Sequence, residues 1–66
     1  MKIFINGEAK NLQNLKTIAD LISFYELDIK KVAIEKDLQV ITPDKYSSTN
    51  LNENCQIEIV HFIGGG

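Results

Sequence analysis

The chain has 66 residues, of which 44% are hydrophobic and 24% charged, a mixture typical of one small globular domain. Seven lysines, no arginine and nine acidic residues give a net charge of −2, which disfavours binding to a nucleic-acid backbone. A lone cysteine excludes an internal disulfide, and no Cys/His cluster offers a metal site. With no membrane-length apolar run and no signal peptide, we expect a cytoplasmic domain that binds neither nucleic acid nor membrane.

The first predicted element is a β-hairpin. Residues 2–5 are rich in strand formers and run into Asn6-Gly7, the favoured dipeptide of a two-residue hairpin turn because both positions tolerate positive φ. We therefore expect residues 8–12 to return as a short antiparallel strand.

One helix follows the hairpin. Thr17 is a typical N-cap, and Asp20 lies three residues later, where a negative charge suits the helix dipole. Apolar residues then recur with helical spacing, and we expect the helix to end near Glu26. The residues of this apolar stripe are Ile18, Leu21, Ile22 and Tyr25.

The second half of the chain predicts three more strands. Residues 32–35 alternate with period two, Lys36-Asp37 is a polar turn, and residues 38–42 form a strand that Pro43 ends. Residues 44–54 are polar, with Tyr46 and Leu51 as apolar anchors. Residues 56–63 form the last and most hydrophobic strand.

This order of elements predicts an α+β fold. The last strand is expected in the centre of the sheet, parallel to the first, because these two are the most apolar strands. With the right-handed crossover rule, the result is a ubiquitin-like β-grasp, a mixed four- or five-stranded sheet packed on one helix. We assign residues 1–63 to this domain and residues 64–66 to a flexible C-terminal glycine tail.

The helix can cover only one face of the sheet. Alternation places Ile3, Ile5, Ile57 and Ile59 beneath the helix. The opposite face then carries Phe4, Val60 and Phe62, and we expect them to form an apolar patch that binds a partner. The alternative is that these three are strand formers tolerated at the surface.

The sequence contains few parts for an active site. His61 and Cys55 are the only residues of their types, and about 20 Å of extended strand separates them, too far for a nucleophile–base pair. What remains is Gly64, Gly65 and Gly66: a tail without side chains can enter a narrow channel, and it ends in a carboxylate that another protein could activate. The alternative is a frayed terminus without function.

The ordered set of motifs resembles a known family. Ile-Asn-Gly-Glu at 5–8, Val-Ala-Ile-Glu at 32–35, Val40-Ile41 before Pro43, and Ile57-Glu58-Ile59-Val60 leading to Gly64-Gly65-Gly66 are similar to the ThiS family of ubiquitin-like sulfur carriers in thiamine biosynthesis. The sequence departs from the family pattern at Asp44, where an arginine is frequent, and at Asn54-Cys55, where Gly-Asp is frequent. Asn54 can adopt the positive φ of a glycine.

The resemblance implies a sulfur carrier that is a protein co-substrate and no enzyme. An E1-like adenylating enzyme would use ATP and Mg²⁺ to adenylate the Gly66 carboxylate, with Gly64 and Gly65 threaded into its channel. A persulfide derived from cysteine by a desulfurase would convert the adenylate to a thiocarboxylate, which would donate its sulfur to thiazole synthase. This chain itself would bind no cofactor.

Two other functions stay open at this point. The small subunit of molybdopterin synthase resembles the chain in fold and tail, although it tends to be longer. A ubiquitin-like binding module would use the sheet patch alone, with the glycines incidental.

Overall fold

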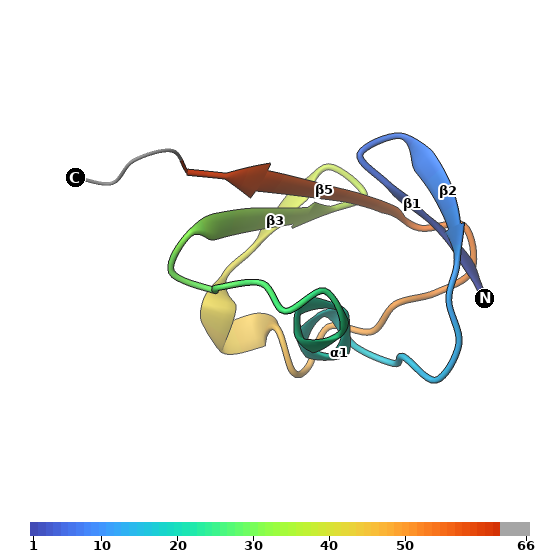
Figure 1. Ribbon diagram of the computed structural model, residues 1–66, viewed down its shortest axis with the longest axis horizontal. Helices are drawn as coiled ribbons and strands as arrows, with labels where there is room; N and C mark the ends of the chain where they lie inside the picture. The colour runs from blue at the N-terminus through green and yellow to red at the C-terminus, as the bar shows by residue number, and fades with distance from the viewer. Residues whose placement is uncertain (63–66) are drawn as a thin grey trace.

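The computed structural model describes residues 1–62, in which a five-stranded mixed sheet carries its helices on one side (Figure 1). The strands follow the order β2-β1-β5-β3-β4. β5 pairs parallel with β1 and antiparallel with β3, so the last strand is central as predicted. The elements are β1 (Lys2–Ile5), β2 (Glu8–Asn11), α1 (Ile18–Phe24), β3 (Val32–Lys36), β4 (Gln39–Ile41), the 3₁₀ helix η1 (Pro43–Lys45) and β5 (Gln56–His61). The fold is the predicted ubiquitin-like β-grasp.

The β1–β2 hairpin turns at Asn6-Gly7, as the sequence predicts. Both residues have positive φ, 50° and 83°, the geometry of a type I′ turn, whose twist matches that of the flanking strands. Ile5 pairs with Glu8 across the turn. The hairpin therefore returns β2 along the outer edge of the sheet and leaves the other edge of β1 free to pair with β5.

A capping box begins α1. The Thr17 hydroxyl accepts a 3.2 Å hydrogen bond from the Asp20 N–H, and the Asp20 carboxylate accepts from the Thr17 N–H at 3.0 Å and the Lys16 N–H at 2.8 Å. These hydrogen bonds, that from Lys16 first, hold the pKa of the Asp20 carboxyl below its ordinary value, because they favour the charged form.

The prediction that α1 ends near Glu26 is wrong by two residues. The helix ends at Phe24, and Glu26 has a positive φ of 53°. The N–H groups of Glu26 and Leu27 donate to the carbonyls of Ser23 and Ile22, which makes a Schellman motif. Tyr25, predicted on the buried stripe, is instead the C-cap residue and is 37% exposed, because the helix stops before its side chain can follow the stripe.

The turn between β3 and β4 lies one residue later than predicted. Asp37 and Leu38 both have positive φ, so Leu38 is a turn residue and does not begin β4. Asp37 is fixed there by β5, since its N–H donates to the Gln56 carbonyl and its carboxylate accepts from the Gln56 N–H. This long-range contact, which no local pattern reports, sets the register of the turn.

The core lies between the sheet and the helices. Tyr46 and Leu51 are buried as predicted, and the segment that carries them is bound to the start of α1 through the Ile18 and Ala19 N–H groups. Ile59, predicted to lie beneath the helix, is only partly buried and packs against the edge of this core. The buried apolar residues of the described part are Ile3, Ile5, Ile18, Leu21, Ile22, Val32, Ile34, Tyr46, Leu51, Cys55 and Ile57.

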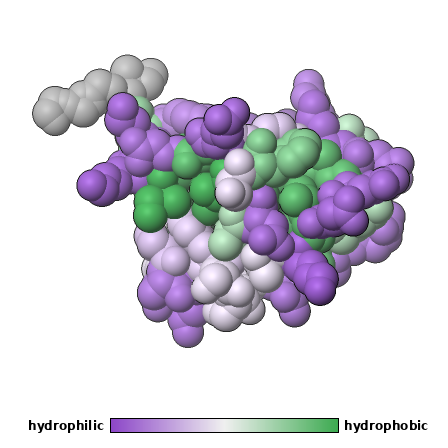
Figure 2. Space-filling view, turned by 60° about the horizontal axis from the view of Figure 1, so that its bottom comes forward, coloured by the Kyte–Doolittle hydropathy of each residue, from purple (hydrophilic) through white to green (hydrophobic). Residues whose placement is uncertain are grey.

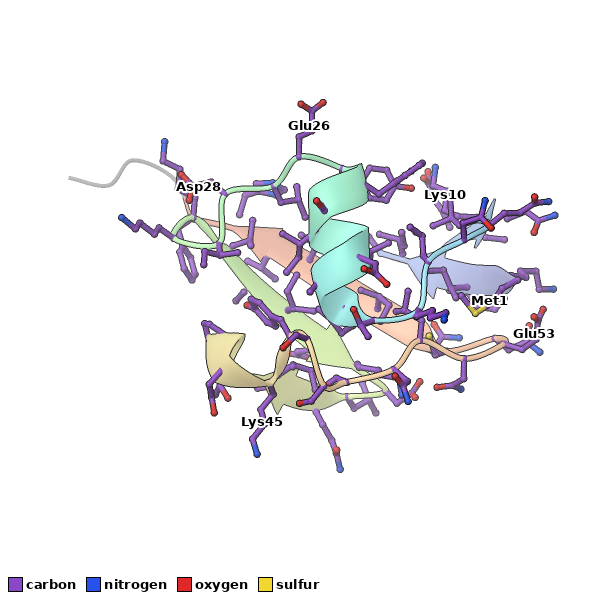
Figure 3. The ribbon with its side chains drawn as sticks, turned by 90° about the horizontal axis from the view of Figure 1, so that it is seen from below. Met1, Lys10, Glu26, Asp28, Lys45 and Glu53 are labelled. Atoms are coloured by element: carbon purple, nitrogen blue, oxygen red, sulfur yellow. The ribbon has the colours of Figure 1, made fainter. Side chains whose placement is uncertain are left out.

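Viewed from the helix side, α1 crosses in front of the strands, and the labelled charged side chains of Lys10, Glu26 and Lys45 lie at the periphery (Figure 3). α1 has only seven residues. Within residues 1–62, no helix has the length and apolar composition that a membrane span requires.

Candidate functional site

The candidate site begins where β5 ends. The strand runs away from the N-terminus toward the opposite end of the molecule (Figure 1). Its side chains change from buried at Ile57 to partly buried at Ile59 and exposed from Val60 onward. Gly64, Gly65 and Gly66, the residues predicted to carry the chemistry, lie outside the described residues. The structure therefore defines the base of the predicted tail and the surface around it.

Hydrogen bonds hold this end of β5 on both sides. On the β3 side, the Phe62 N–H donates to the Lys31 carbonyl at 2.8 Å, which continues the ladder one residue past His61. On the β1 side, the side-chain amide of Asn6 makes two hydrogen bonds to the main chain of Ile59. From the sequence, Asn6 is predicted only as a turn residue, and this contact is not predicted. The signal in the sequence is that Asn6, a polar residue, directly follows a strand predicted to pair with the central strand.

The patch predicted on the outer face of the sheet is only partly assembled. Val60 and Phe62 are 53% and 57% exposed, and they follow each other on the same side of β5. Phe4 pairs with Gln56, four residues before Val60, so about 13 Å of strand separates them. The Lys2 ammonium also lies over the Phe4 ring, 5.4 Å from its centre. Phe4 thus stands apart from the other two residues.

A neighbour on β3 extends the patch instead. Ala33 pairs directly with Val60 across the β3–β5 ladder and so lies on the same face. We call Ala33, Val60 and Phe62 the outer-face patch. Two residues further along the ladder, on the same face, Glu35 pairs with Glu58, which places two carboxylates opposite each other beside the patch. Directly opposed like charges destabilise a sheet, and among residues 1–62 the one ion pair is Lys10–Glu8, elsewhere on the molecule.

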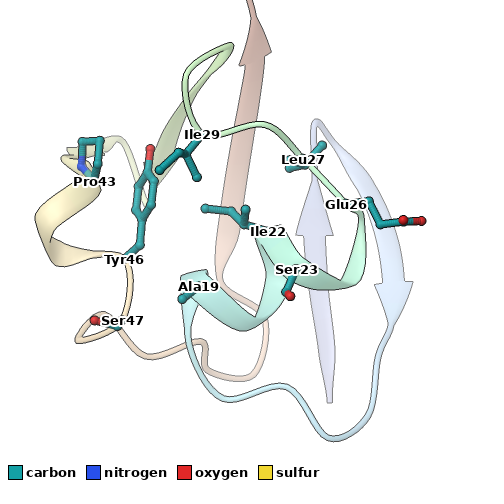
Figure 4. A pocket seen from close by; sticks show the side chains of 9 residues that line it. All are labelled: Ala19, Ile22, Ser23, Glu26, Leu27, Ile29, Pro43, Tyr46 and Ser47. Carbon is teal, nitrogen blue, oxygen red and sulfur yellow. The ribbon is translucent and has the colours of Figure 1, made fainter.

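The helix side of the molecule holds a shallow pocket of about 600 Å³ between α1 and η1. Pro43 and Tyr46 line it from one side and Ala19 and Ile22 from the other (Figure 4). Figure 2, seen from the side of α1 and η1, shows apolar surface bordered by hydrophilic side chains. Glu26 is the only carboxylate among the lining residues, so the pocket offers no acid–base pair.

The two residues considered for sulfur or proton chemistry lie apart from this pocket. Cys55 is a free thiol, 2% exposed, in the core beneath the sheet. His61 is exposed at the end of β5. In the part of the chain that the structure describes, no three His, Cys, Asp or Glu side chains gather as metal ligands.

Comparison with known families is decisive. The model of the family described as "ThiS family" matches residues 3–66, which includes Gly64, Gly65 and Gly66. The chain belongs to the ThiS family. It is 38% identical over 63 residues to a Bacillus subtilis protein named sulfur carrier protein ThiS, covering 94% of this chain and 96% of that protein.

Two further comparisons place this ThiS-family chain among known proteins. It is 38% identical over its full length to a Paramagnetospirillum magneticum protein named thiazole synthase, but spans only 20% of that relative. A crystal structure of a thiamine biosynthesis protein (ThiS) from Geobacter metallireducens, 20% identical, matches it with a TM-score of 0.84 over 100% of both chains. The second likeness concerns the fold, which is that of the β-grasp described above.

Both departures from the family pattern have a local structural basis. Asn54 has a φ of 67°, the left-handed conformation that glycine favours and asparagine tolerates, so the turn before β5 is kept. Asp44 accepts a 2.6 Å hydrogen bond from the Thr42 hydroxyl, which lowers the pKa of its carboxyl. Asp44 therefore places a negative charge at the start of η1.

Proposed function

We propose that this chain is a sulfur carrier protein of thiamine biosynthesis, a protein co-substrate that performs no catalysis of its own. The observation that carries the proposal is the match to the ThiS family through residue 66, which covers the three glycines after β5. The name of the Bacillus subtilis relative supports the same function.

The reacting group in this proposal is the carboxylate of Gly66. An E1-like adenylating enzyme, with ATP and Mg²⁺ as its own cofactors, joins this carboxylate to AMP and releases pyrophosphate. The terminal sulfur of a persulfide, which a cysteine desulfurase generates, then attacks the acyl carbon and expels AMP. A thiol then cleaves the S–S bond of the resulting acyl disulfide, which releases the Gly66 thiocarboxylate and joins that thiol in a disulfide to the cysteine that carried the persulfide. Gly64 and Gly65 are the residues that thread into the enzyme.

Thiazole synthase is the proposed acceptor of this sulfur. Support comes from two proteins named thiazole synthase, each of which contains a segment similar to this entire chain. A protein that carried both a sulfur carrier and its acceptor would keep the two together. The outer-face patch, with Glu35 and Glu58 beside it, is the proposed docking surface for the adenylating enzyme. Its chemistry suits a partner surface that offers apolar side chains and a basic group. Phe4, also predicted to bind the partner, would lie at the far end of that interface.

Intact-mass measurement tests the proposal. After incubation with an adenylating enzyme, ATP, Mg²⁺, cysteine and a desulfurase, the chain should gain about 16 Da, because one carboxylate oxygen becomes sulfur. Fragmentation should place the gain at Gly66. Cys55→Ser should gain the same mass, whereas a persulfide on Cys55 would add about 32 Da and be lost in that variant. An unchanged mass would instead favour a plain binding module.

Transfer to the acceptor separates the two sulfur-carrier functions. The sulfurated chain should lose the added mass when mixed with thiazole synthase and its substrates. If it loses the mass only with the large subunit of molybdopterin synthase and the precursor of molybdopterin, the carrier belongs to that pathway.

The position of the carboxylate gives a second test. Deleting Gly66, or adding one residue after it, shifts the reacting carbon by about 3.5 Å, and a displacement near 1 Å can already cost 10²-fold in rate. Pyrophosphate exchange into ATP should therefore fall at least 100-fold. All residues of the buried core in the described part fall within positions 3–57 of the chain, so the melting temperature should stay the same. A truncated chain that exchanges at the wild-type rate would contradict the assignment of Gly66.

A further inference from the structure

The side chain of Asn6 completes the pairing of β5 where the main chain of β1 no longer reaches it. The Phe4 N–H donates to the Cys55 carbonyl and the Asn6 N–H to the Ile57 carbonyl, each at 2.9 Å, a regular step of two residues along both strands. At the next step, Ile59, the chain has already turned into β2. There the Asn6 Oδ1 accepts from the Ile59 N–H at 2.8 Å, and its Nδ2 donates to the Ile59 carbonyl at 3.2 Å.

Without this amide, the polar main-chain groups of Ile59 would have no partner in the sheet. In an antiparallel ladder alternate residues direct their N–H and C=O groups to the partner strand. The Phe62 N–H donates to the carbonyl of Lys31, the residue before β3. By this alternation, the main-chain N–H and C=O of Val60 point toward β3, and those of Ile59 point away from β3. The Asn6 amide offers one acceptor and one donor, which is the pair that Ile59 requires.

We propose that Asn6 is a positioning residue for the activation of the Gly66 carboxylate, an inference that rests on the function proposed above. The amide of Asn6 and the carbonyl of Lys31 hold β5 from its two edges, at Ile59 and Phe62, shortly before Gly64. Loss of the Asn6 contact frees β5 on one side and widens the range of directions in which it presents the tail. Within the docked complex, the carboxylate is then correctly placed for a smaller fraction of the time.

Two variants of the Asn6-Gly7 turn separate a positioning role of the Asn6 amide from an effect on overall stability. Asn6→Gly keeps the positive φ that the type I′ turn needs, since Gly-Gly is also favoured there, and removes only the amide. Gly7→Asn is the matched control. An added Cβ at Gly7 would meet no atom within 4 Å, but its φ of 83° strains any side chain, so this variant stresses the turn and keeps the amide.

The experiment uses the full chain of each variant with the adenylating enzyme, ATP and Mg²⁺, and follows pyrophosphate exchange as a function of carrier concentration. For Asn6→Gly we expect kcat to fall by about 10- to 100-fold with KM within about twofold, because docking is kept and orientation is lost. Amide exchange of the Ile59 N–H should speed up at least tenfold. Gly7→Asn should lower the melting temperature and leave kcat and the Ile59 exchange rate unchanged.

Three results would overturn the inference: a wild-type kcat for Asn6→Gly, an equal loss of kcat in Gly7→Asn, or unchanged exchange at Ile59. The wild-type chain separates this failure from that of the proposed function. If it is adenylated and only the variants disagree, the positioning role alone is wrong. If the wild-type chain is never adenylated, the function fails together with the role assigned to Asn6.

Discussion

At the scale of single residues, the turns concentrate the backbone strain of this small domain. Among residues 1–62, six residues other than glycine have positive φ, and four of them are asparagine or aspartate, which tolerate this conformation best. Glu26 and Leu38 are the other two. Leu38 has a φ of 72° and is 88% exposed, so its side chain contributes little packing in return for the strain.

Replacing Leu38 with glycine should stabilise the protein. The variant would place Asp-Gly, a favoured type I′ dipeptide, at positions 37 and 38, and relief of the left-handed strain should exceed the greater flexibility of glycine in the unfolded chain. We expect a gain of about 1 kcal/mol in the free energy of unfolding, or a rise in melting temperature of about 4–8 °C for a domain of this size. Leu38→Ala is the control, and it should give no gain because alanine keeps the strain. Equal gains in both variants would attribute the effect to the exposed side chain.

At the scale of elements, α1 depends on its ends. A helix of seven residues is far below the length at which isolated helices are stable in water. The capping box at Thr17 and the Schellman motif at Glu26 satisfy main-chain groups at the two ends. The Ile18 N–H donates to the Thr49 carbonyl and the Leu51 N–H to the Lys16 carbonyl, which bind the long loop to the start of the helix. The helix is therefore held by its caps and by the core.

The cap at Asp20 predicts a specific dependence of stability on pH. The native pKa of Asp20 is lowered, so its contribution is complete above the unfolded value of about 3.9 and is lost as the pH falls through the lower native value. Asp20→Asn should therefore be less stable than the wild type at pH 7, and the difference should shrink below about pH 4. Urea denaturation of both proteins between pH 2 and 7 measures this. A difference that stays constant over the range would show that the carboxylate charge has no part in the cap.

Sequence patterns predict the structure correctly where local interactions control it. The turn at Asn6-Gly7 and the cap at Thr17 follow from side chains whose hydrogen bonds or φ preferences act within a few residues. Sequence patterns mislead where a contact between residues distant in sequence determines the local conformation. Leucine is unfavourable at position 38 because its φ is positive there. The hydrogen bonds between Asp37 and Gln56 keep the turn at this position all the same.

The candidate site shows the same limit. Alternation along β5 correctly paired Val60 with Phe62 on one side of the strand, but it contains no information on the register between parallel strands. The pairing of Phe4 with Gln56, which separates Phe4 from Val60, is a property of the assembled sheet. The same holds for the Asn6 amide, whose partner Ile59 lies 53 residues away in the chain.

At the scale of the whole molecule, the sheet has one covered and one open face. α1 and η1 lie together on one side (Figure 1), and the exposed Val60 belongs to the other. β5 takes part in both environments: its first half contributes Ile57 to the core, and its second half leaves the core with Val60 and Phe62 exposed. The strand thus connects a rigid base to the residues that precede the proposed tail.

This division predicts opposite effects for two charges introduced along the same stretch of chain. Phe62→Asp should weaken binding to the adenylating enzyme by about 2 kcal/mol or more, because it removes an aromatic anchor beside the tail. Its effect on the free energy of unfolding should stay within about 0.5 kcal/mol, since Phe62 is 57% exposed. Ile57→Asp is the matched control: that side chain is 1% exposed, and an unpaired buried charge should unfold the domain.

Melting curves and binding isotherms of both variants measure these effects. Ile57 is a sharper control than Ile59, which is only partly buried beside the Asn6 amide and would combine the two effects. If Phe62→Asp lowers the melting temperature as much as Ile57→Asp, Phe62 supports the fold and the outer face is not a free docking surface. If Phe62→Asp keeps both its stability and its affinity, the adenylating enzyme holds the carrier elsewhere, and the outer-face patch loses its assigned role. The expected result, normal melting with weakened binding, would place the enzyme on the open face of the sheet, where β5 emerges from the core.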